Sequence, residues 1–248
     1  MSNTMTAEES SRLQRLQREV AHGATTTAVH QAEFGWDSPA GIIRRQRRID
    51  FICNGIPRDA KVLEVGAGTG LQTAGLLQHF SNIVGIDISP ELLEVARKRA
   101  PGAEYLVMDA HAPSYPKESF DAIVGVSILH HLDWDLALQN YYPLLRPGGF
   151  LRFSEPNLLN PQIFLQKNIP FIKRMVGDSP DEYAFTPGQI RRSLAQAGFT
   201  QIDVQPYEFL HPGTPERWIP AVIRLESFLM RTPLRSIGGS LLIGARRA

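Results

Sequence analysis

The chain has 248 residues, of which 43% are hydrophobic and 21% charged, a composition typical of a globular protein with a sizeable core. Its 26 basic and 25 acidic residues give a formal net charge of +1, so no global charge directs it toward nucleic acid. A single cysteine, Cys53, excludes an internal disulfide framework and a cysteine-based zinc cluster, and no metal site is expected. This favours a reduced, cytoplasmic setting.

The N-terminal stretch "MSNTMTAEESSRLQRLQREVAHG" contains acids and lacks a long apolar core. It predicts a loose tail and a polar amphipathic helix rather than a signal peptide or a membrane span. The next element, within "EFGWDSPAGIIRRQRRIDFI", is a predicted helix that follows Trp36. Its arginines are Arg44, Arg45, Arg47 and Arg48.

From about residue 60, short β-branched segments alternate with helical patterns. The predicted strands cover residues 61–65, 82–87, 104–109, 120–126, 149–155, 201–210 and 239–247. Ser89 with Pro90 begins one helix, and Thr186 with Pro187 begins another that Gly198 ends. This alternation predicts an α/β fold, a parallel sheet covered by helices on both faces.

Three regions fall outside the alternation and are expected to elaborate a single domain. Residues 1–58 form an N-terminal helical cap, 59–156 the ligand-binding core, and 157–184 and 211–237 two insertions. Apolar residues of the second insertion recur at helical spacing, which favours a helix packed on its own domain. The alternative is that both insertions cap a hydrophobic or lipid-linked substrate and touch the membrane surface. Before the fifth strand, Pro147 and the two glycines after it are expected to end a helix.

The stretch "KVLEVGAGTG", residues 61–70, ends a predicted strand in a turn with Gly66, Gly68 and Gly70. Glycines there let a ligand approach the backbone, and the following helix offers unpaired N–H groups. The dinucleotide fingerprint G-x-G-x-x-G needs its third glycine where this chain has Leu71. The turn therefore disfavours a nicotinamide dinucleotide.

Carboxylates at three successive strand ends refine the expected ligand. Glu64 would repel a pyrophosphate but accept a hydrogen bond from a ligand ammonium. Asp87 suits the two hydroxyls of a ribose. Asp109 either reads an adenine edge or merely caps a turn. Together they predict a nucleoside with a positively charged amino-acid tail.

These segments resemble the class I S-adenosylmethionine-dependent methyltransferases, and most closely the small-molecule type of ubiquinone and menaquinone biosynthesis. The resemblance runs from about Lys61 to Phe199 through "VLEVGAGTG", "IVGIDISPELLEVARKRA", "YLVMDA", "FDAIVGVSILHHL" and "LLRPGGFLRFSEP". It implies a Rossmann-like, doubly wound sheet of seven strands, mostly parallel with the last strand antiparallel, plus helical cap insertions. It also implies S-adenosyl-L-methionine as cofactor.

The resemblance further implies which residues bind the cofactor. They are Glu64, Gly66, Gly68, Gly70, Asp87, Ile88, Asp109, Ala110 and Ser127. The glycine turn would face the methionine part, Asp87 the ribose, and Asp109 with Ala110 the adenine. Ser127, just past the fourth strand, matches a position whose backbone helps hold the cofactor.

The stretch "SILHHLDW" follows the fourth strand at the edge where ligands bind in such sheets. His131 matches a histidine that recurs there in the resembling enzymes, and its imidazole could accept a proton from a hydroxyl. The alternative is a histidine that bonds the loop backbone. Trp36, His130 and Glu155 are expected on the substrate side, with a core anchor as the alternative for Trp36 and a merely packed or exposed side chain as the alternative for His130. The arginines after Trp36 either pair with an anionic ligand or form a solvated basic face.

Methyl transfer is an in-line displacement, so positioning supplies most of the catalysis, and a base is needed only where the nucleophile carries a proton. The favoured acceptor is a hydroxyl oxygen of a sugar, lipid-linked or isoprenoid/aromatic metabolite, with N- or C-methylation as the alternative. Nucleobase methyltransferases of this class carry an Asn- or Asp-Pro-Pro-aromatic motif where this chain has "SILH", which argues against nucleic acid. A nicotinamide-dependent oxidoreductase and a non-catalytic cofactor-binding subunit are the competing classes.

Overall fold

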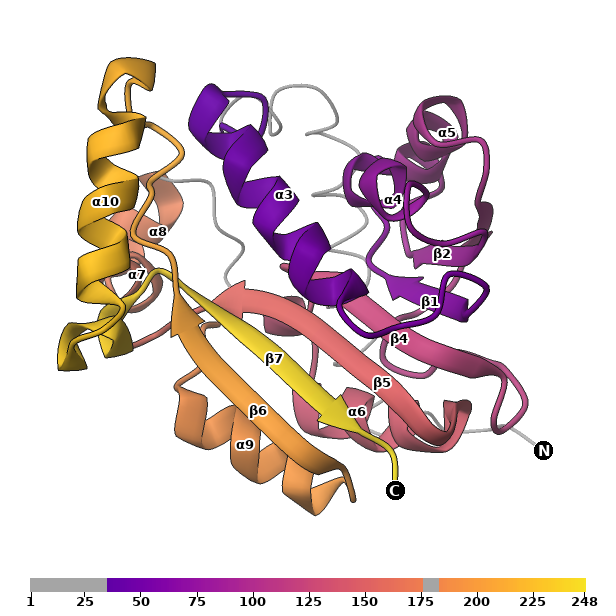
Figure 1. The fold of residues 1–248 in the computed structure, drawn as a ribbon. Helices are drawn as coiled ribbons and strands as arrows, with labels where there is room; N and C mark the ends of the chain where they lie inside the picture. Colours follow the sequence, from indigo (N-terminus) through magenta and orange to yellow (C-terminus); the bar gives the residue numbers. More distant parts are fainter. Residues whose placement is uncertain (1–34, 176–182) are drawn as a thin grey trace.

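The computed structural model describes residues 35–175 and 183–248, and the predicted N-terminal helix before residue 35 lies outside them. Seven strands form one sheet in the order β3-β2-β1-β4-β5-β7-β6 (Figure 1). Their bounds are β1 Lys61–Val65, β2 Asn82–Asp87, β3 Glu104–Val107, β4 Phe120–Val126, β5 Leu145–Pro156, β6 Thr200–Tyr207 and β7 Ser240–Arg246. Strand β7 runs antiparallel to both β5 and β6, while β1 to β5 pair in parallel. The predicted seven-stranded sheet with an antiparallel last strand is confirmed.

Helices cover both faces of the sheet, because apolar side chains of the central strands point alternately to each side. On one face lie α3 Pro39–Cys53, α4 Leu71–Leu76 and α5 Pro90–Arg99; on the other lie α6 Trp134–Tyr141 and α9 Pro187–Gln196 (Figure 1). Val62 joins the core under α3 and α4, whereas its neighbour Leu63 joins the core under α6 and α9. The doubly wound arrangement follows from this alternation.

The predicted helix starts are confirmed. The hydroxyl of Ser89 accepts a hydrogen bond from the N–H of Leu92, and Thr186 forms a capping box with Gln189. After α9, Gly198 takes a left-handed backbone with φ 95°, which ends the helix as expected.

The expectation for Pro147 and its two glycines is wrong. Helix α6 and the short 3-10 helix η2, Tyr142–Leu144, end before them, and β5 begins at Leu145. Leu145 pairs with Phe120, and the register then shifts before the next pairs. The Pro-Gly-Gly segment therefore forms an irregularity inside the strand, which the positive φ of Gly148 accommodates.

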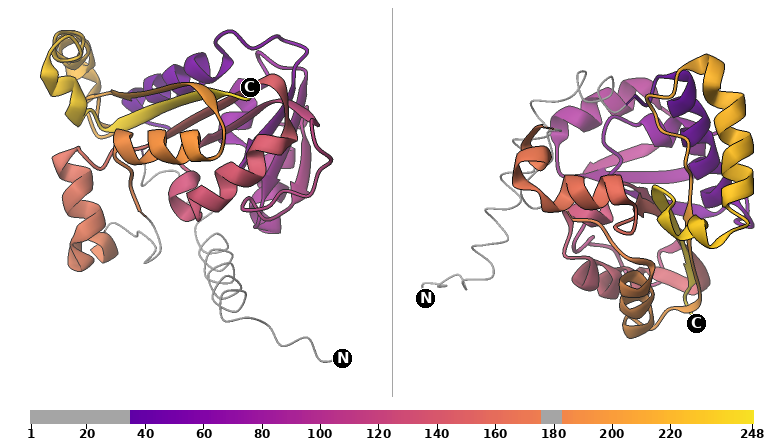
Figure 2. Two further views of the ribbon diagram at one scale, coloured as in Figure 1. Left: turned by 90° about the horizontal axis from the view of Figure 1, so that it is seen from below. Right: turned by 90° about the vertical axis from the view of Figure 1, so that its left-hand side faces the viewer.

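The two insertions lie at one end of the molecule, away from α5 (Figures 1 and 2). The first contains α7 Pro161–Asn168 and α8 Pro170–Met175; the second contains η3 Glu216–Trp218, α10 Ile219–Leu229 and η4 Pro233–Ile237. A further short helix, η1 Leu129–His131, follows β4. Within the described residues, no helix is long and apolar enough to cross a bilayer.

Candidate active site

The turn after β1 brings the glycines against two neighbouring segments. Gly66, Gly68 and Gly70 all have positive φ, between 52° and 73°. A Cβ on Gly66 would lie 2.6 Å from the side chain of Ile128, and one on Gly70 would lie 2.9 Å from the backbone of Ala96. A Cβ on Gly68 would meet nothing within 4 Å. Gly66 and Gly70 are therefore required by packing, and only Gly68 presents open backbone.

Asp87 ties the end of β2 to this turn. Its Oδ2 accepts from the N–H of Gly68 at 2.9 Å, and its Oδ1 accepts from the N–H of Ser89 at 2.9 Å. Burial raises the pKa of Asp87, and these two N–H groups with that of Ile88 oppose the shift. The carboxylate thus holds the turn beside Ile88, and its contact with a ribose stays a prediction.

Glu64 lies beneath the turn and is 3% exposed. The hydroxyl of Thr73, on α4, donates to its Oε2 at 2.6 Å. Burial raises the pKa of Glu64 to about 8, a shift that the Thr73 hydroxyl opposes. A cationic ligand group near this carboxyl would favour its ionised form. Thr73 carries no sequence signal that would have singled it out.

Asp109 follows β3 and caps a turn, which was the alternative weighed for it. Its Oδ1 accepts from the N–H of His111 at 2.8 Å and lies 2.9 Å from Nδ1 of the same residue. The other ring nitrogen of His111 accepts from the N–H of Asp133, so the ring carries its proton on Nδ1. Next to it, the carbonyl of Ala110 accepts from the hydroxyl of Tyr141. Neither contact tests the expected adenine recognition, and His111 was not among the residues expected from the sequence.

Glu155, at the end of β5, organises the loop after β4. The carboxylate is 1% exposed, and its Oε1 accepts from the N–H groups of Ile128 and Leu129, each at 2.9 Å. Its Oε2 lies 2.8 Å from Nδ1 of His130. Burial raises the pKa of Glu155 to about 7, and the two N–H groups and the charge of His131 oppose this shift. With three of its contacts fixed, the carboxylate sets the orientation of the His130 ring.

The two histidines lie against each other on η1, with ring centroids 4.2 Å apart and an interplanar angle of 37°. The charge of His131 also lowers the pKa of Asp87, against the larger effect of burial. His131 therefore lies within electrostatic range of carboxylates at the ends of two strands, β2 and β5. Just before the histidines, Ser127 has a positive φ of 55° and donates its N–H to the carbonyl of Ser154.

A cavity of about 420 Å³ opens beside this loop. Its lining residues come from α3, the ends of β4 and β5, α7 and the segment after β6. They include Trp36, Arg44, Arg48, Ser127, His130, His131, Glu155, Asn160, Gln162, Ile163, Gln166, Glu208, Phe209 and Leu210. The cavity thus has an apolar wall, an amide-rich wall on α7 and a carboxylate–histidine pair at its base.

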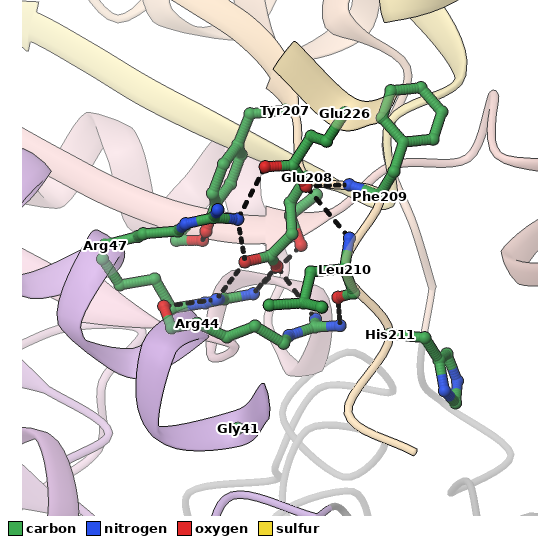
Figure 3. Close-up of polar contacts among 12 residues, drawn as sticks. Gly41, Arg44, Arg47, Tyr207, Glu208, Phe209, Leu210, His211 and Glu226 are labelled. Carbon is green, nitrogen blue, oxygen red and sulfur yellow. Dashed lines mark hydrogen bonds and ion pairs between the residues drawn. The ribbon is translucent and has the colours of Figure 1, made fainter. Parts of the chain in front are cut away.

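Arginines of α3 form one wall and are bound by carboxylates of this chain (Figure 3). Arg44 and Arg48 approach Oε2 of Glu208 at 3.0 and 2.9 Å. Arg47 lies 2.8 Å from Oε1 of Glu226, whose other oxygen accepts from two backbone N–H groups. Glu208 is 3% exposed and holds a left-handed backbone with φ 73°. Sequence reasoning identified the basic helix but missed both of these acidic partners, which follow more than 150 residues later.

Comparison with known proteins finds methyltransferases. Residues 63–153 match the family model of a methyltransferase domain. The ubiquinone/menaquinone biosynthesis C-methyltransferase UbiE of Escherichia coli is 28% identical over 194 residues, which cover 66% of this chain and 75% of that protein. The matched domain identifies the chain as a methyltransferase, and its relatives and fold support the class I S-adenosylmethionine-dependent type.

Solved methyltransferase structures share the whole fold. An S-adenosylmethionine-dependent methyltransferase from Thermotoga maritima has a TM-score of 0.65 at 20% identity and covers 89% of this chain and 96% of its own. The N-methyltransferase NodS from Bradyrhizobium japonicum WM9, in complex with S-adenosylhomocysteine, has a TM-score of 0.60 at 18% identity. The match covers 94% of this chain and 97% of the NodS chain. The comparisons therefore favour methyl transfer over the competing prediction of a nicotinamide-dependent oxidoreductase.

In this methyltransferase the structure brings the expected acceptor-side residues together. Trp36, His130, His131 and Glu155 all line the same cavity, and Ser127 also lines it. Trp36 also lies under the guanidinium of Arg48, 5.1 Å from its ring centroid, so it is both a wall and a packing partner. The remaining expected cofactor residues lie along the ends of β1, β2 and β3, as their positions in the sequence predict.

Proposed function

We propose that this methyltransferase methylates a hydroxyl oxygen of a small amphiphilic acceptor, with His130 as the base. The observation that supports this is the 2.8 Å contact between Nδ1 of His130 and the buried carboxylate of Glu155. The pair lines the cavity at the ends of β4 and β5, where ligands bind in open parallel sheets. A histidine oriented by a buried carboxylate is the arrangement that general-base catalysis needs.

The residues in this proposal have separate tasks. S-adenosylmethionine, when bound, supplies an electrophilic methyl group whose sulfur leaves as a neutral thioether. His130 takes the acceptor proton on Nε2, because Glu155 faces Nδ1. The imidazolium that forms is stabilised by the Glu155 carboxylate. The proton thus ends on His130 and the methyl group on the acceptor oxygen. The N–H groups of Ile128 and Leu129 keep the Glu155 carboxylate in position during the transfer.

The residues that would hold the cofactor are those expected from the sequence. They are Glu64, Gly66, Gly68, Gly70, Asp87, Ile88, Asp109, Ala110 and Ser127. Their chemistry fits: the open backbone at Gly68 admits a close ligand, and the carboxyl of Glu64, neutral without a partner, gains from a ligand ammonium. Asp87 accepts a hydrogen bond from the N–H of Gly68 and its charge acts on Glu64, which supports assigning the ribose to it.

The cavity favours an acceptor with one apolar part and one hydroxylated part. Trp36, Ile163 and Leu210 supply apolar surface, while Asn160 and Gln162 of the first insertion supply hydrogen-bonding groups. A lipid-linked saccharide or a hydroxylated isoprenoid/aromatic metabolite has this character. The 28% identical relative is a C-methyltransferase, which makes carbon beside a phenolic hydroxyl the second candidate for the accepting atom. Both candidates require the hydroxyl proton to be removed.

His131 was the base expected from the sequence, and this expectation stays a prediction beside the proposal for His130. The proposal for His130 rests on the 2.8 Å contact between its Nδ1 and Oε2 of Glu155. The His131 ring lies tilted against that ring, with the centroids 4.2 Å apart, and its charge acts on both Asp87 and Glu155. Its charge is suited to stabilising the ionised carboxylates on either side.

The test combines an acceptor screen with variants of the pair. Methyl-tritiated S-adenosylmethionine is supplied with sugar, prenylated phenol and hydroquinone acceptors, and the ¹³C shift of a labelled product methyl separates oxygen from carbon. Glu155→Gln keeps the shape but would donate to Nδ1 of His130, so kcat is expected to fall by about 10²–10⁴ while S-adenosylhomocysteine binds unchanged. A fall for His131→Gln and none for Glu155→Gln or His130→Gln would reject His130 as the base.

A further inference from the structure

Helix α10 is apolar on two sides, although only one of them packs on the domain. Its inner side is formed by Ile219, Val222 and Ile223, which lie in a small cluster with Ala40 and Leu210. This confirms in part the expectation that the second insertion packs on its own domain. It leaves the outer side unexplained.

The outer face of α10 is the stripe Trp218, Ala221, Leu225 and Phe228, at spacings of three and four residues. Trp218 is 55% exposed, Leu225 56% and Phe228 64%. Contiguous exposed apolar surface on a protein marks an interaction site. The stripe therefore requires a covering partner.

Four arginines accompany this stripe in the sequence, and they indicate which partner it fits. They are Arg217, Arg224, Arg231 and Arg235, all exposed. Within residues 35–175 and 183–248, none of these four guanidinium groups forms an ion pair. The exposed acid near them is Glu216, whereas Glu226 is buried and bound to Arg47. A second copy packed face to face would bring these like charges together, which is unfavourable.

We infer that the outer face of α10 docks on an anionic lipid surface, with the apolar stripe in the interface and the arginines at the phosphate groups. Tryptophan, phenylalanine and leucine flanked by arginine are the composition of helices that lie in a membrane interface. Each basic residue near such a surface adds to the attraction.

The position of α10 gives this docking a consequence for the site. Leu210 and Pro212, which precede α10, and Ile163 and Gln166 of α7 line the cavity. The first insertion lies at the same end of the molecule (Figure 2) and exposes Phe171 by 69%. A surface that meets α10 therefore lies near the rim of the cavity. The inference concerns this surface alone and stands whichever acceptor atom is methylated.

The experiment is co-sedimentation of the full chain with vesicles of phosphatidylcholine alone or of phosphatidylcholine mixed with phosphatidylglycerol. We expect sedimentation with the mixed vesicles that weakens as salt is raised. Leu225→Gln combined with Phe228→Gln should lower the partition coefficient by at least about tenfold. Arg224→Gln should lower it by about fivefold. The matched controls, Leu136→Gln on α6 and Lys98→Gln on α5, should leave it unchanged.

Calorimetric binding of S-adenosylhomocysteine shows that each variant is folded, and it reports on the cofactor site separately from lipid. Failure to sediment with the mixed vesicles would overturn the inference. Equal sedimentation of the Leu225/Phe228 variant would overturn it too, because another surface would then bind. A dimer that this variant abolishes, without vesicle binding, would assign the face to a second copy instead.

Discussion

Replacing Glu208 by glutamine tests whether one buried carboxylate holds the wall of the cavity. The side chains of Glu208 and Arg48 are 1% and 3% exposed, and Arg44 joins them with 16% exposure. Glu208→Gln keeps the volume but removes the charge that two buried cations share. Ser240 and the carbonyl of Arg44 remain as neutral acceptors for Arg48. Leaving a buried charge without its partner costs about 3–5 kcal/mol of the free energy of unfolding.

The assay is urea unfolding followed by far-ultraviolet circular dichroism, with the denaturant slope required to stay constant so that midpoints report stability. Glu94→Gln is the control, because the Arg97–Glu94 pair is 42% and 67% exposed and should change stability by less than about 0.5 kcal/mol. A second variant, Arg48→Met with Glu208→Leu, should recover part of the loss, since it removes the more buried cation together with the carboxylate while Arg44 keeps the carbonyl of Leu210 as an acceptor. A loss below about 1 kcal/mol for Glu208→Gln would refute the reasoning.

Three further predictions concern the cofactor half of the site. Burial holds the pKa of Glu64 near 8, well above its value in an unfolded chain, so the folded state keeps the proton on Glu64. The free energy of unfolding should therefore fall as pH rises from about 4.5 to 8. Glu64→Gln should flatten this dependence in unfolding measured across that range. Wild type should also release a proton on binding S-adenosylhomocysteine, seen as a buffer-dependent binding enthalpy that Glu64→Gln lacks; the same enthalpy in every buffer would contradict this. Gly66→Ala places a Cβ 2.6 Å from Ile128 at φ 71° and should cost about 1–3 kcal/mol by urea unfolding, whereas Gly68→Ala should cost less, since only strain acts there. Asp87→Ala should abolish micromolar binding of S-adenosylhomocysteine in calorimetry, and unchanged binding would remove Asp87 from the site.

Local patterns in the sequence determined the strands, the helix starts and the glycine turn. Each depends on neighbours along the chain: the alternation of Val62 and Leu63 sends side chains to opposite faces, and Ser89 and Thr186 cap the helices that they precede. The same locality explains the error at Pro147. A Pro-Gly-Gly segment ends regular structure wherever it occurs, but only pairing with β4 decides that it lies inside a strand.

The tertiary structure alone decided which side chains meet. Glu155 and His130 are separated by 25 residues, and Glu208 and Arg48 by 160, so no local pattern could pair them. The sequence marked His130 and the basic helix as candidates because their residue types carry charge or protons. The fold brings Glu155 at the end of β5 to His130, where burial raises the pKa of Glu155. It also brings Glu208, just after β6, to Arg48 of the basic helix. The sequence therefore shows which residues can carry a charge or a proton. Which of them pair, and which lose their contact with water, is decided only when distant segments pack together.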